Sequence, residues 1–188
     1  MLCSAVPAAG EIVPLVLPSV AVIGSRRYLD DRGWTAEAVT DDALRTLGWR
    51  GFAQENQNWS KSADIVRGLH YQLPPYGQAK IVRVQAGAAF SVAADIDPAS
   101  PTFGMWSAAT LDWRSGVSMF VPAKFAHGVL SLEDGTLMSW LVDAPFHGPS
   151  AAGISWDDPL LAIDWPLNGR VPILSERDRG LPSLRSAR

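Results

Sequence analysis

The stretch Arg67–Lys80, RGLHYQLPPYGQAK, decides how the chain around it is arranged. Residues 65–71 read as a short strand, and the PPYG segment that follows excludes both a helix and regular ladder pairing. The chain therefore turns back before a second strand at residues 79–84, and we expect the two strands to lie near each other. Along an undistorted strand Arg67 and His70 face opposite sides, so they can share a site only through twist or a bulge.

Outward from this stretch, residues 51–142 contain short apolar segments that recur roughly every 8 to 12 residues between turn signals. This spacing indicates an all-β sandwich or barrel, and a jelly roll is the form that leaves a cavity for a small molecule. Residues 20–24 read as a first strand. Residues 40–49 are the one convincing helix, with Thr40 as its cap. The Trp- and Pro-rich chain after Asp143 is predicted to wrap the barrel.

Length and composition favour one domain spanning residues 1–188. Residues 1–18 are predicted to be a loosely structured N-terminal arm, and residues 182–188 a possibly disordered tail. The 16 basic and 19 acidic residues leave a net charge of -3, with no Lys/Arg stripe, so nucleic acid is not the expected partner. A small anionic ligand needs only a local cluster of cations.

The N-terminal segment and the single cysteine indicate in which cellular compartment the protein is expected. The first twenty residues have no positively charged start and are interrupted by Glu11 and three prolines, so we predict neither a signal peptide nor a membrane span. Cys3 alone excludes an internal disulfide and fits a reducing compartment, which favours the cytoplasm.

The chain resembles the dTDP-4-dehydrorhamnose 3,5-epimerase family of cupin-like jelly rolls from about residue 20 to residue 180. The motifs that carry this resemblance keep one order along the chain: DDRG at 30–33, QEN at 54–56, RGLHYQ at 67–72, QAKIVRV at 78–84, SPTFG at 100–104, VPAKFAHG at 121–128, WDDP at 156–159, IDWP at 163–166 and ILSERD at 173–178. The resemblance implies an all-β, cupin-like double-stranded β-helix (jelly roll) with short peripheral helices.

The implied activity is epimerisation of a nucleotide-linked 4-keto-6-deoxyhexose at C3, C5 or both. The hydrogens at C3 and C5 are acidic because each carbon adjoins the C4 ketone, and removing one leaves an enolate that needs nearby donors. By resemblance, His70 is the base, Asp178 orients it and Lys80 stabilises the enolate oxygen. Taken alone, a single histidine is more often structural or superficial than catalytic, and Lys80 reads as a surface cation.

The resemblance also implies the substrate-binding residues, which taken singly read as ordinary surface or core residues. They are Arg32, Glu37, Gln54, Asn56, Arg67, His127, Trp140, Phe146 and Arg177. Paired guanidinium groups suit a pyrophosphate because each can donate two parallel hydrogen bonds. Some nucleotide contacts in the family come from a neighbouring subunit, so a homodimer that binds a dTDP-sugar is expected, with no cofactor.

The chain departs from the family pattern chiefly at the residues expected to return a proton to the enolate. The family's tyrosine, which returns a proton to the opposite face, aligns with Trp140, or with Ser139 if the alignment shifts by one residue. Indole N–H is only a donor and a serine hydroxyl is a very weak acid. Ser91 stands where the family has the aspartate partner of His127. The sequence leaves open whether Trp140 faces the cavity or fills the core.

Three other functions remain open at this stage. The first is an epimerase-like cupin recruited to a natural-product pathway, with His70 acting on a non-sugar substrate. The second is a metal-dependent cupin, which generally needs two closely spaced histidines and a carboxylate; His70, His127 and His147 lie far apart in the chain, so no metal is predicted. The third is a noncatalytic binding module, against which the pairing of His70 with Asp178 argues.

Overall fold

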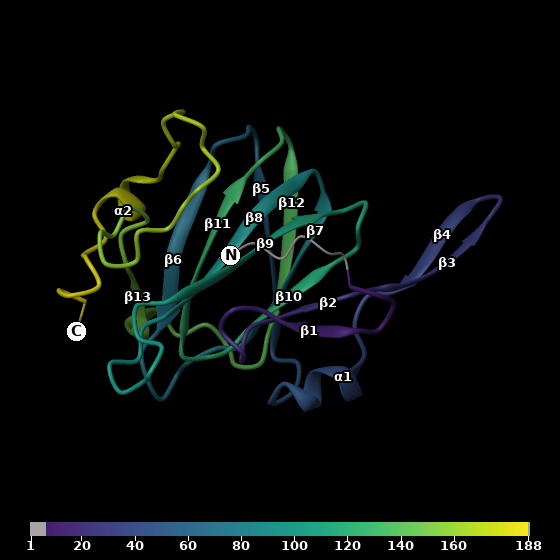
Figure 1. The fold of residues 1–188 in the computed structure, drawn as a ribbon, viewed down its shortest axis with the longest axis horizontal. Coiled ribbons are helices and arrows are strands. Elements are labelled where there is room, and N and C mark those ends of the chain that lie inside the picture. The colour runs from purple at the N-terminus through teal and green to yellow at the C-terminus, as the bar shows by residue number, and fades with distance from the viewer. Residues whose placement is uncertain (1–6, 188) are drawn as a thin grey trace.

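Two antiparallel sheets packed face to face contain most of the strands in the computed structural model, which describes residues 7–187 (Figure 1). The six-stranded sheet runs in the order β1 (Ile12–Pro14), β2 (Ala21–Ile23), β10 (Ser118–Val121), β7 (Lys80–Ala86), β12 (Thr136–Val142) and β5 (Gln54–Ser60). The five-stranded sheet runs in the order β13 (Ala151–Gly153), β6 (Val66–Gln72), β11 (Phe125–Ser131), β8 (Ala88–Asp95) and β9 (Trp106–Asp112). This arrangement confirms the all-β prediction.

From β5 onward the chain changes sheet at almost every step, which is the pattern of a jelly roll. The turn after β6 carries the chain across the sandwich, so β6 and β7 face each other from opposite sheets and do not pair with each other. The sequence correctly predicts two strands joined by a sharp turn. It does not show that the turn crosses between layers, because each strand alternates inward and outward residues in either arrangement.

A bulge in β6 brings Arg67 and His70 to the same face. His127 on β11 pairs with His70, and Val129 pairs with Arg67, so two steps on β11 match three steps on β6. Gly68 lies in this bulge at φ +109°, where an added Cβ would come within 2.6 Å of the carbonyl oxygen of His127. The positive φ and the close approach both require glycine.

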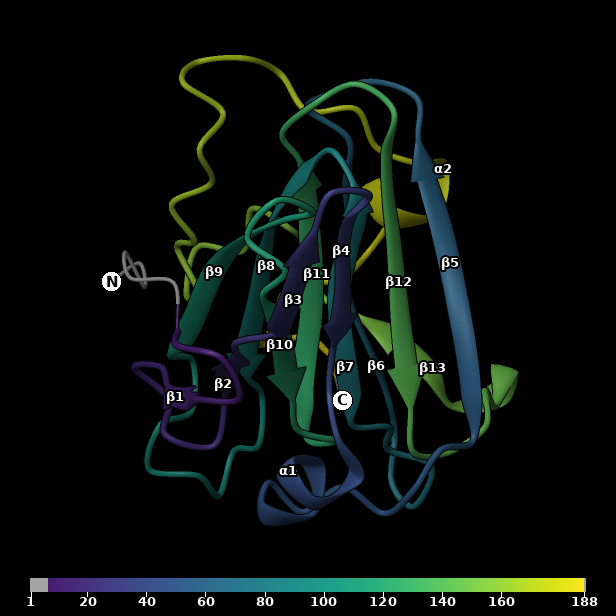
Figure 2. The same ribbon diagram turned by 90° about the vertical axis from the view of Figure 1, so that its right-hand side faces the viewer.

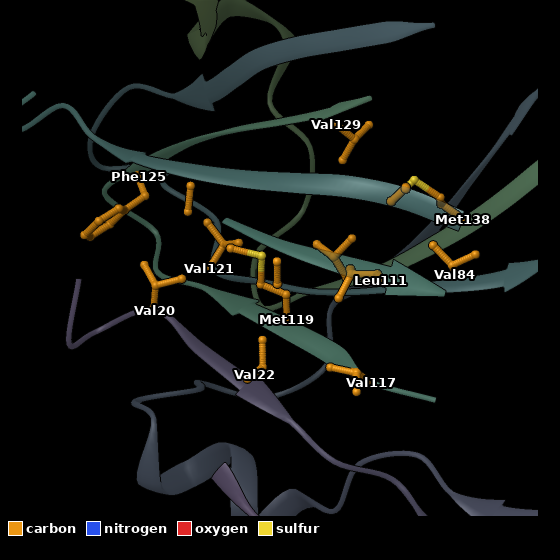
Figure 3. Close-up of a cluster of buried hydrophobic side chains, with 14 of the residues drawn as sticks. Val20, Val22, Val84, Leu111, Val117, Met119, Val121, Phe125, Val129 and Met138 are labelled. Carbon is orange, nitrogen blue, oxygen red and sulfur yellow. The ribbon is translucent and has the colours of Figure 1, made fainter. Parts of the chain in front are cut away.

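Three buried clusters hold the layers together. The first lies between the sheets and includes Met119, Val121 and Leu111, which Figure 3 shows gathered among the strands. The second covers the outer face of the five-stranded sheet, where the segment after β13 contributes Leu161 and Trp165. This packing agrees with the predicted wrapping by the C-terminal part of the chain.

Leu69 shows how the second cluster determines the direction of neighbouring side chains. Its side chain is fully buried in that cluster, on the side of β6 away from the other sheet. Truncating such a buried leucine costs about 2–5 kcal/mol of stability, so burial of Leu69 anchors the strand and leaves His70 on the opposite, inner side. Gly153 approaches Leu69 closely from β13, where an added Cβ would lie 2.7 Å from the Leu69 carbonyl oxygen.

The helices are short and peripheral. The predicted helix at residues 40–49 is α1 (Asp41–Thr46), whose first turn is capped when the Thr40 hydroxyl accepts from the Ala43 N–H at 3.3 Å. It packs over the third cluster on the outer face of the six-stranded sheet. The sequence did not predict α2 (Glu176–Arg179), a single turn capped by Ser175, or the 3-10 turn η1 (Gly148–Ser150).

The chain ends carry more structure than their composition suggests. Strand β1 forms within the predicted N-terminal arm and pairs with β2. Near the other end, Leu184 is buried in the second cluster, and its N–H donates to the Asp158 carboxylate at 2.7 Å. Cys3 lies outside the described residues. No helix within residues 7–187 has the length and apolar character needed to cross a membrane.

A separate two-stranded hairpin, β3 (Arg26–Asp30) with β4 (Gly33–Glu37), extends away from both sheets in Figure 1 and lies in front of them, toward the viewer, in Figure 2. We call it the hairpin arm. Tyr28, Leu29 and Trp34 on it are exposed. Its base is held by Arg27, which donates to the Trp113 carbonyl at 2.7 Å and stacks its guanidinium over the Trp34 ring at 4.3 Å. The arm therefore presents apolar surface to solvent.

Candidate active site

A pocket of about 460 Å³ opens between the two sheets. This volume lies in the range of small-molecule sites. Val82, Val129 and Met138 belong both to the core between the sheets and to the pocket lining, so the core forms the pocket floor. We call the lining residues of β6 and β11 the five-stranded wall, and those of β5, β7 and β12 the six-stranded wall.

His70 and Asp178 form a hydrogen bond in this pocket although 108 positions separate them in the chain. His70 Nε2 lies 2.6 Å from Asp178 Oδ1. The Asp178 side chain is only 6% exposed, whereas that of His70 is 39% exposed and lines the pocket. Ser175 fixes Asp178 by accepting its N–H at 3.1 Å at the start of α2. Because the carboxylate accepts the Nε2 hydrogen, it leaves His70 Nδ1 as the proton acceptor.

The environment of His70 favours its neutral form. Burial lowers the pKa of His70 below its ordinary value of 6.5, because a charged imidazolium loses hydration there. The Asp178 carboxylate acts in the opposite direction, and the positive charges of Arg177 and Lys80 lower the pKa further. The net result is an imidazole that is neutral, oriented and able to accept a proton at neutral pH.

Lys80 brings a cation next to this base. It begins β7 and is buried, and its Nζ donates to the His70 carbonyl oxygen at 3.2 Å. The ammonium therefore reaches across the pocket toward the five-stranded wall. Burial lowers the pKa of Lys80 to about 8, since the desolvated ammonium loses stabilisation by water. The residue thus places a positive charge and spare N–H donors where an oxyanion could form.

His127 lies directly beside His70 on the neighbouring strand. Burial lowers the pKa of His127 well below 6.5, and the positive charge of Lys80 lowers it further. Its Nε2 lies 3.0 Å from the hydroxyl oxygen of Ser91, which is fully buried. A neutral hydroxyl cannot stabilise an imidazolium as a carboxylate would, so His127 is suited to hydrogen bonding as a neutral ring.

The structure shows whether the Trp140 side chain faces the cavity or fills the core. This residue lines the pocket on β12, paired with Val82 of β7 and Asn56 of β5. Ser139 points the other way, where its hydroxyl accepts from Gln85 at 3.0 Å. Trp140 therefore faces the pocket, and Ser139 takes no part in the lining.

Most of the other predicted substrate-binding residues gather around the same pocket. Asn56, Arg67, Phe146 and Arg177 all line it. Gln54 is not part of the lining but touches two lining residues: it donates to Asn56 Oδ1 at 2.6 Å and accepts the Phe146 N–H at 3.1 Å.

Arg32 and Glu37 do not reach the pocket of their own chain. Both lie on the hairpin arm, and neither is among the lining residues. The Arg32 side chain is 90% exposed and pairs with Asp30 at 2.6 Å. Their expected role in nucleotide binding stays a prediction, because some nucleotide contacts were expected to come from a neighbouring subunit.

Several polar lining residues were missed in the sequence, including Asn58, Gln72 and Gln78. A signal was present for Asn58: along β5 the half-buried Gln54, Asn56 and Asn58 alternate with exposed residues, so one face of the strand is consistently polar. Such a polar stripe on a strand inside a sandwich indicates a solvent-accessible pocket. No comparable pattern marked Gln78, which precedes β7 in a turn.

Among residues 7–187, His, Cys, Asp and Glu side chains form no group of three or more that could hold a metal ion. Besides the Asp178 carboxylate, the surroundings of His70 include the ammonium of Lys80, the guanidinium of Arg177 and the ring of His127. The chemistry that these side chains support is proton removal from carbon, with cationic and neutral donors for the resulting oxyanion.

Comparison with known proteins gives a consistent result. The sequence profile of the family described as dTDP-4-dehydrorhamnose 3,5-epimerase matches residues 14–186. The enzyme of that name from Sinorhizobium fredii is 39% identical over 171 residues, which cover 90% of this chain and 87% of the relative.

Solved structures agree in fold. The dTDP-6-deoxy-D-glucose-3,5-epimerase of Legionella pneumophila, in complex with dTDP-4-keto-L-rhamnose, superposes with a TM-score of 0.88 at 34% identity, over 94% of this chain and 93% of that one. A 3'-monoepimerase from Streptomyces bikiniensis, in complex with dTDP-quinovose, superposes with a TM-score of 0.85 at 28% identity. The match covers 92% of this chain and 87% of the monoepimerase chain. The cupin-like jelly roll is thus confirmed.

Proposed function

The chain belongs to the dTDP-4-dehydrorhamnose 3,5-epimerase family, and we propose that it epimerises a dTDP-linked 4-keto-6-deoxyhexose by removing a proton next to the C4 ketone. The observation that carries this proposal is the neutral His70 held by the buried Asp178 inside a pocket of suitable size. The relatives, all named for sugar-nucleotide epimerisation, do not support the alternative of a cupin recruited to a non-sugar substrate.

We propose the following roles for the pocket residues. His70 Nδ1 takes the hydrogen of C3 or C5 as a proton, the C–H electron pair forms a double bond to C4, and the carbonyl pair moves to the C4 oxygen. Lys80 stabilises that enolate oxygen with its ammonium group. Asp178 holds the resulting imidazolium by its negative charge and keeps the ring in one orientation. When the enolate is reprotonated on the opposite face, the carbon is inverted.

Reprotonation is where this chain departs from its family. Apart from Lys80, whose Nζ reaches over to the His70 carbonyl oxygen, the six-stranded wall offers amide, aliphatic, thioether and indole groups at Asn56, Asn58, Val82, Met138 and Trp140. None of these five is an acid of useful strength. We propose that water supplies the proton on this side and that inversion is restricted to C3 or C5. The 3'-monoepimerase among the structural neighbours shows that single-carbon epimerisation occurs on this fold.

The nucleotide is proposed to bind around the pocket rim. Arg177 and Arg67 line the pocket and offer guanidinium groups to a pyrophosphate, while Phe146 exposes 59% of its surface beside them. The Legionella enzyme in complex with dTDP-4-keto-L-rhamnose supports a dTDP-sugar as the substrate class. We propose that no metal and no cofactor takes part. The single cysteine fits our proposal of a reducing, cytoplasmic compartment.

A homodimer is the second part of the proposal. Arg32 and Glu37 lie on the hairpin arm, away from the pocket of their own chain, and the arm exposes Leu29 and Trp34. An exposed apolar arm with Arg32 at its tip suits insertion against a second copy, where Arg32 would face the anionic substrate.

Deuterium incorporation tests the reaction. The protein is incubated with dTDP-4-keto-6-deoxyglucose in D₂O, and NMR follows label at C3 and C5. Label at one or both carbons is expected, and His70→Ala should prevent it while leaving dTDP affinity largely intact. If the wild-type protein introduces no label at either carbon, the proposed function is wrong.

The dimer is tested by light scattering and by complementation. The Arg32→Ala and His70→Ala proteins, each of low activity, are mixed after mild dissociation and reassociation. Mixed dimers contain one pocket with both residues intact, so activity should reappear. A monomer in solution, or no gain on mixing, would contradict the proposal.

A further inference from the structure

Ser91 carries a fully buried hydroxyl with a single partner. It lies on β8, on the same face of the strand as Ala89 and Ala93, which belong to the apolar cluster between the sheets. Within residues 7–187, the one hydrogen-bond partner of this hydroxyl is Nε2 of His127, at 3.0 Å. The direction of this one bond therefore decides where the hydroxyl hydrogen goes.

The hydrogen bond between the two side chains can run in two directions. If Nε2 of His127 carried a hydrogen and donated it, the serine O–H would have no acceptor in a place that water does not reach. If the serine donates, its hydrogen is satisfied and Nε2 accepts. A buried donor without an acceptor loses its hydration and gains nothing in return, so donation by Ser91 is favoured.

This direction also fixes the hydrogen of the His127 ring. With Nε2 as the acceptor, the neutral ring carries its hydrogen on Nδ1, the nitrogen left for the pocket that His127 lines. His70, its register partner on β6, has the opposite tautomer, because its Nε2 donates to the Asp178 carboxylate. The two neighbouring rings thus offer the substrate one proton acceptor and one neutral donor.

The donor of His127 lies near the cation of the same pocket. Lys80 lines the pocket too, and it is close enough for its charge to lower the pKa of both His70 and His127. When a base removes a hydrogen next to a ketone, the oxygen that gains charge lies two bonds from the carbon that loses the proton. Donors for that oxygen must therefore lie close beside the base. A neutral imidazole held in one tautomer can serve as such a donor.

We propose that Ser91 is a positioning residue that holds His127 in the Nδ1–H tautomer, so that His127 and Lys80 together donate to the C4 oxygen of the bound ketosugar. The inference rests on the proposed function and adds a second donor beside Lys80. Ser91 acts only through the His127 ring and takes no part in proton transfer.

Long-range proton–nitrogen NMR spectra of protein labelled at histidine test the tautomer directly. The chain has 3 histidines, so single substitutions assign the signals. We expect a hydrogen on Nδ1 for His127 and on Nε2 for His70. A hydrogen on Nε2 of His127 in the wild type would overturn the inference.

Two substitutions of equal size test the consequence for the reaction. The carboxylate of Ser91→Asp can only accept, so it should move the His127 hydrogen to Nε2 and slow deuterium exchange into the ketosugar by about 10²-fold, the effect of losing one donor to an oxyanion. Ser91→Asn has an N–H that can donate to Nε2, so it should keep the wild-type tautomer and most of the rate. Rates are compared at a pH at which the spectra show a neutral His127 ring, because the new carboxylate raises the pKa of that ring.

A control variant and a second ligand separate tautomer control from general damage. Ser107→Ala removes another fully buried hydroxyl of the same sheet, one that accepts from the Leu17 N–H, and should leave the His127 tautomer unchanged. If Ser91→Asp fails to fold, the wild type carries the test. Its His127 Nδ1–H resonance should move downfield when dTDP-4-keto-6-deoxyglucose is added, and it should stay in place with dTDP, which has no ketone. Equal shifts with both ligands would contradict donation to the C4 oxygen.

Two further outcomes would overturn the inference: a reversed tautomer in Ser91→Asp with exchange undiminished, or equal slowing in Ser91→Asp and Ser91→Asn. Failure of the proposed function looks different. A wild-type protein that does not label the ketosugar in D₂O would remove the role at C4, whereas the spectrum of the His127 ring would still decide which nitrogen carries the hydrogen.

Discussion

The two walls of the pocket differ in what they can do with a proton. The five-stranded wall contributes His70 and His127, and α2 adds Asp178 behind His70. The six-stranded wall contributes amides, aliphatic groups and the indole of Trp140. Its one titratable lining residue within the described chain is Lys80, whose Nζ reaches over to the His70 carbonyl. Proton chemistry is therefore concentrated on one side of the substrate site.

This asymmetry separates two steps that an epimerase normally couples. Removal of a proton needs only the five-stranded wall and Lys80, so exchange with solvent should be efficient. Inversion also needs a proton from the other side, where the wall offers no acid apart from Lys80, the proposed partner of the enolate oxygen. The ratio of inversion to exchange thus measures the difference between the walls.

The largest effect is expected from His70→Ala, which removes the base from the reactive wall. Turnover should fall by about 10⁴-fold, the upper end of the range for loss of a general base. Label incorporation in D₂O and product formation should fall together, while calorimetry should show dTDP affinity close to that of the wild type. Retention of exchange would show that another group removes the proton.

Lys80→Met should cost roughly 10²- to 10³-fold in turnover, as expected for loss of one donor to an oxyanion. The pH profile gives a sharper reading. Because the charged form of Lys80 is needed and its pKa is about 8, activity should decline above that pH. Lys80→Arg keeps a cation at all accessible pH values and should abolish this decline. A decline that persists in Lys80→Arg would assign it to another group.

Asp178→Asn should reduce kcat by about 10²-fold, because the imidazole loses its orientation. The same change predicts the direction of a pH shift. The carboxylate raises the pKa of His70 against the effect of burial, so its removal lowers that pKa further. As the pH is lowered, the fall in kcat/KM should therefore begin below pH 6.5 in the wild type and at a still lower pH in the variant. A shift to higher pH would contradict the proposed pairing.

The smallest effect, and the one most specific to this chain, is expected from Trp140→Tyr. A phenol at this position supplies an acid where the wild type has an indole, so the ratio of inversion to exchange should rise by about tenfold. Trp140→Phe is the matched control, because it shortens the side chain without adding an acid. If both variants change the ratio equally, the gain comes from space in the pocket, and water is not the limiting donor.

Much of the difference between the two pocket walls could be predicted from the sequence motifs. His70, Lys80, His127 and Arg177 were named as site residues from sequence, and the structure places all four on one pocket. The sequence also indicated that Arg67 and His70 could share a site only through twist or a bulge, since they face opposite sides of a regular strand, and β6 has such a bulge. Gln72, which also lines the pocket, was not found, because its partner, the backbone N–H of His147, lies 75 positions away in the chain.

By itself, the amino-acid sequence determined the family and the all-β class and singled out His70 as the candidate base, since each depends on local patterns or on the order of motifs. Only the tertiary structure decided which wall each side chain belongs to. It turned Trp140 toward the pocket and Ser139 away from it, and it left Arg32 and Glu37 on an arm beyond reach of their own pocket. The physical reason is that side-chain alternation defines two faces of a strand, whereas which face becomes a pocket depends on the sheet packed against it.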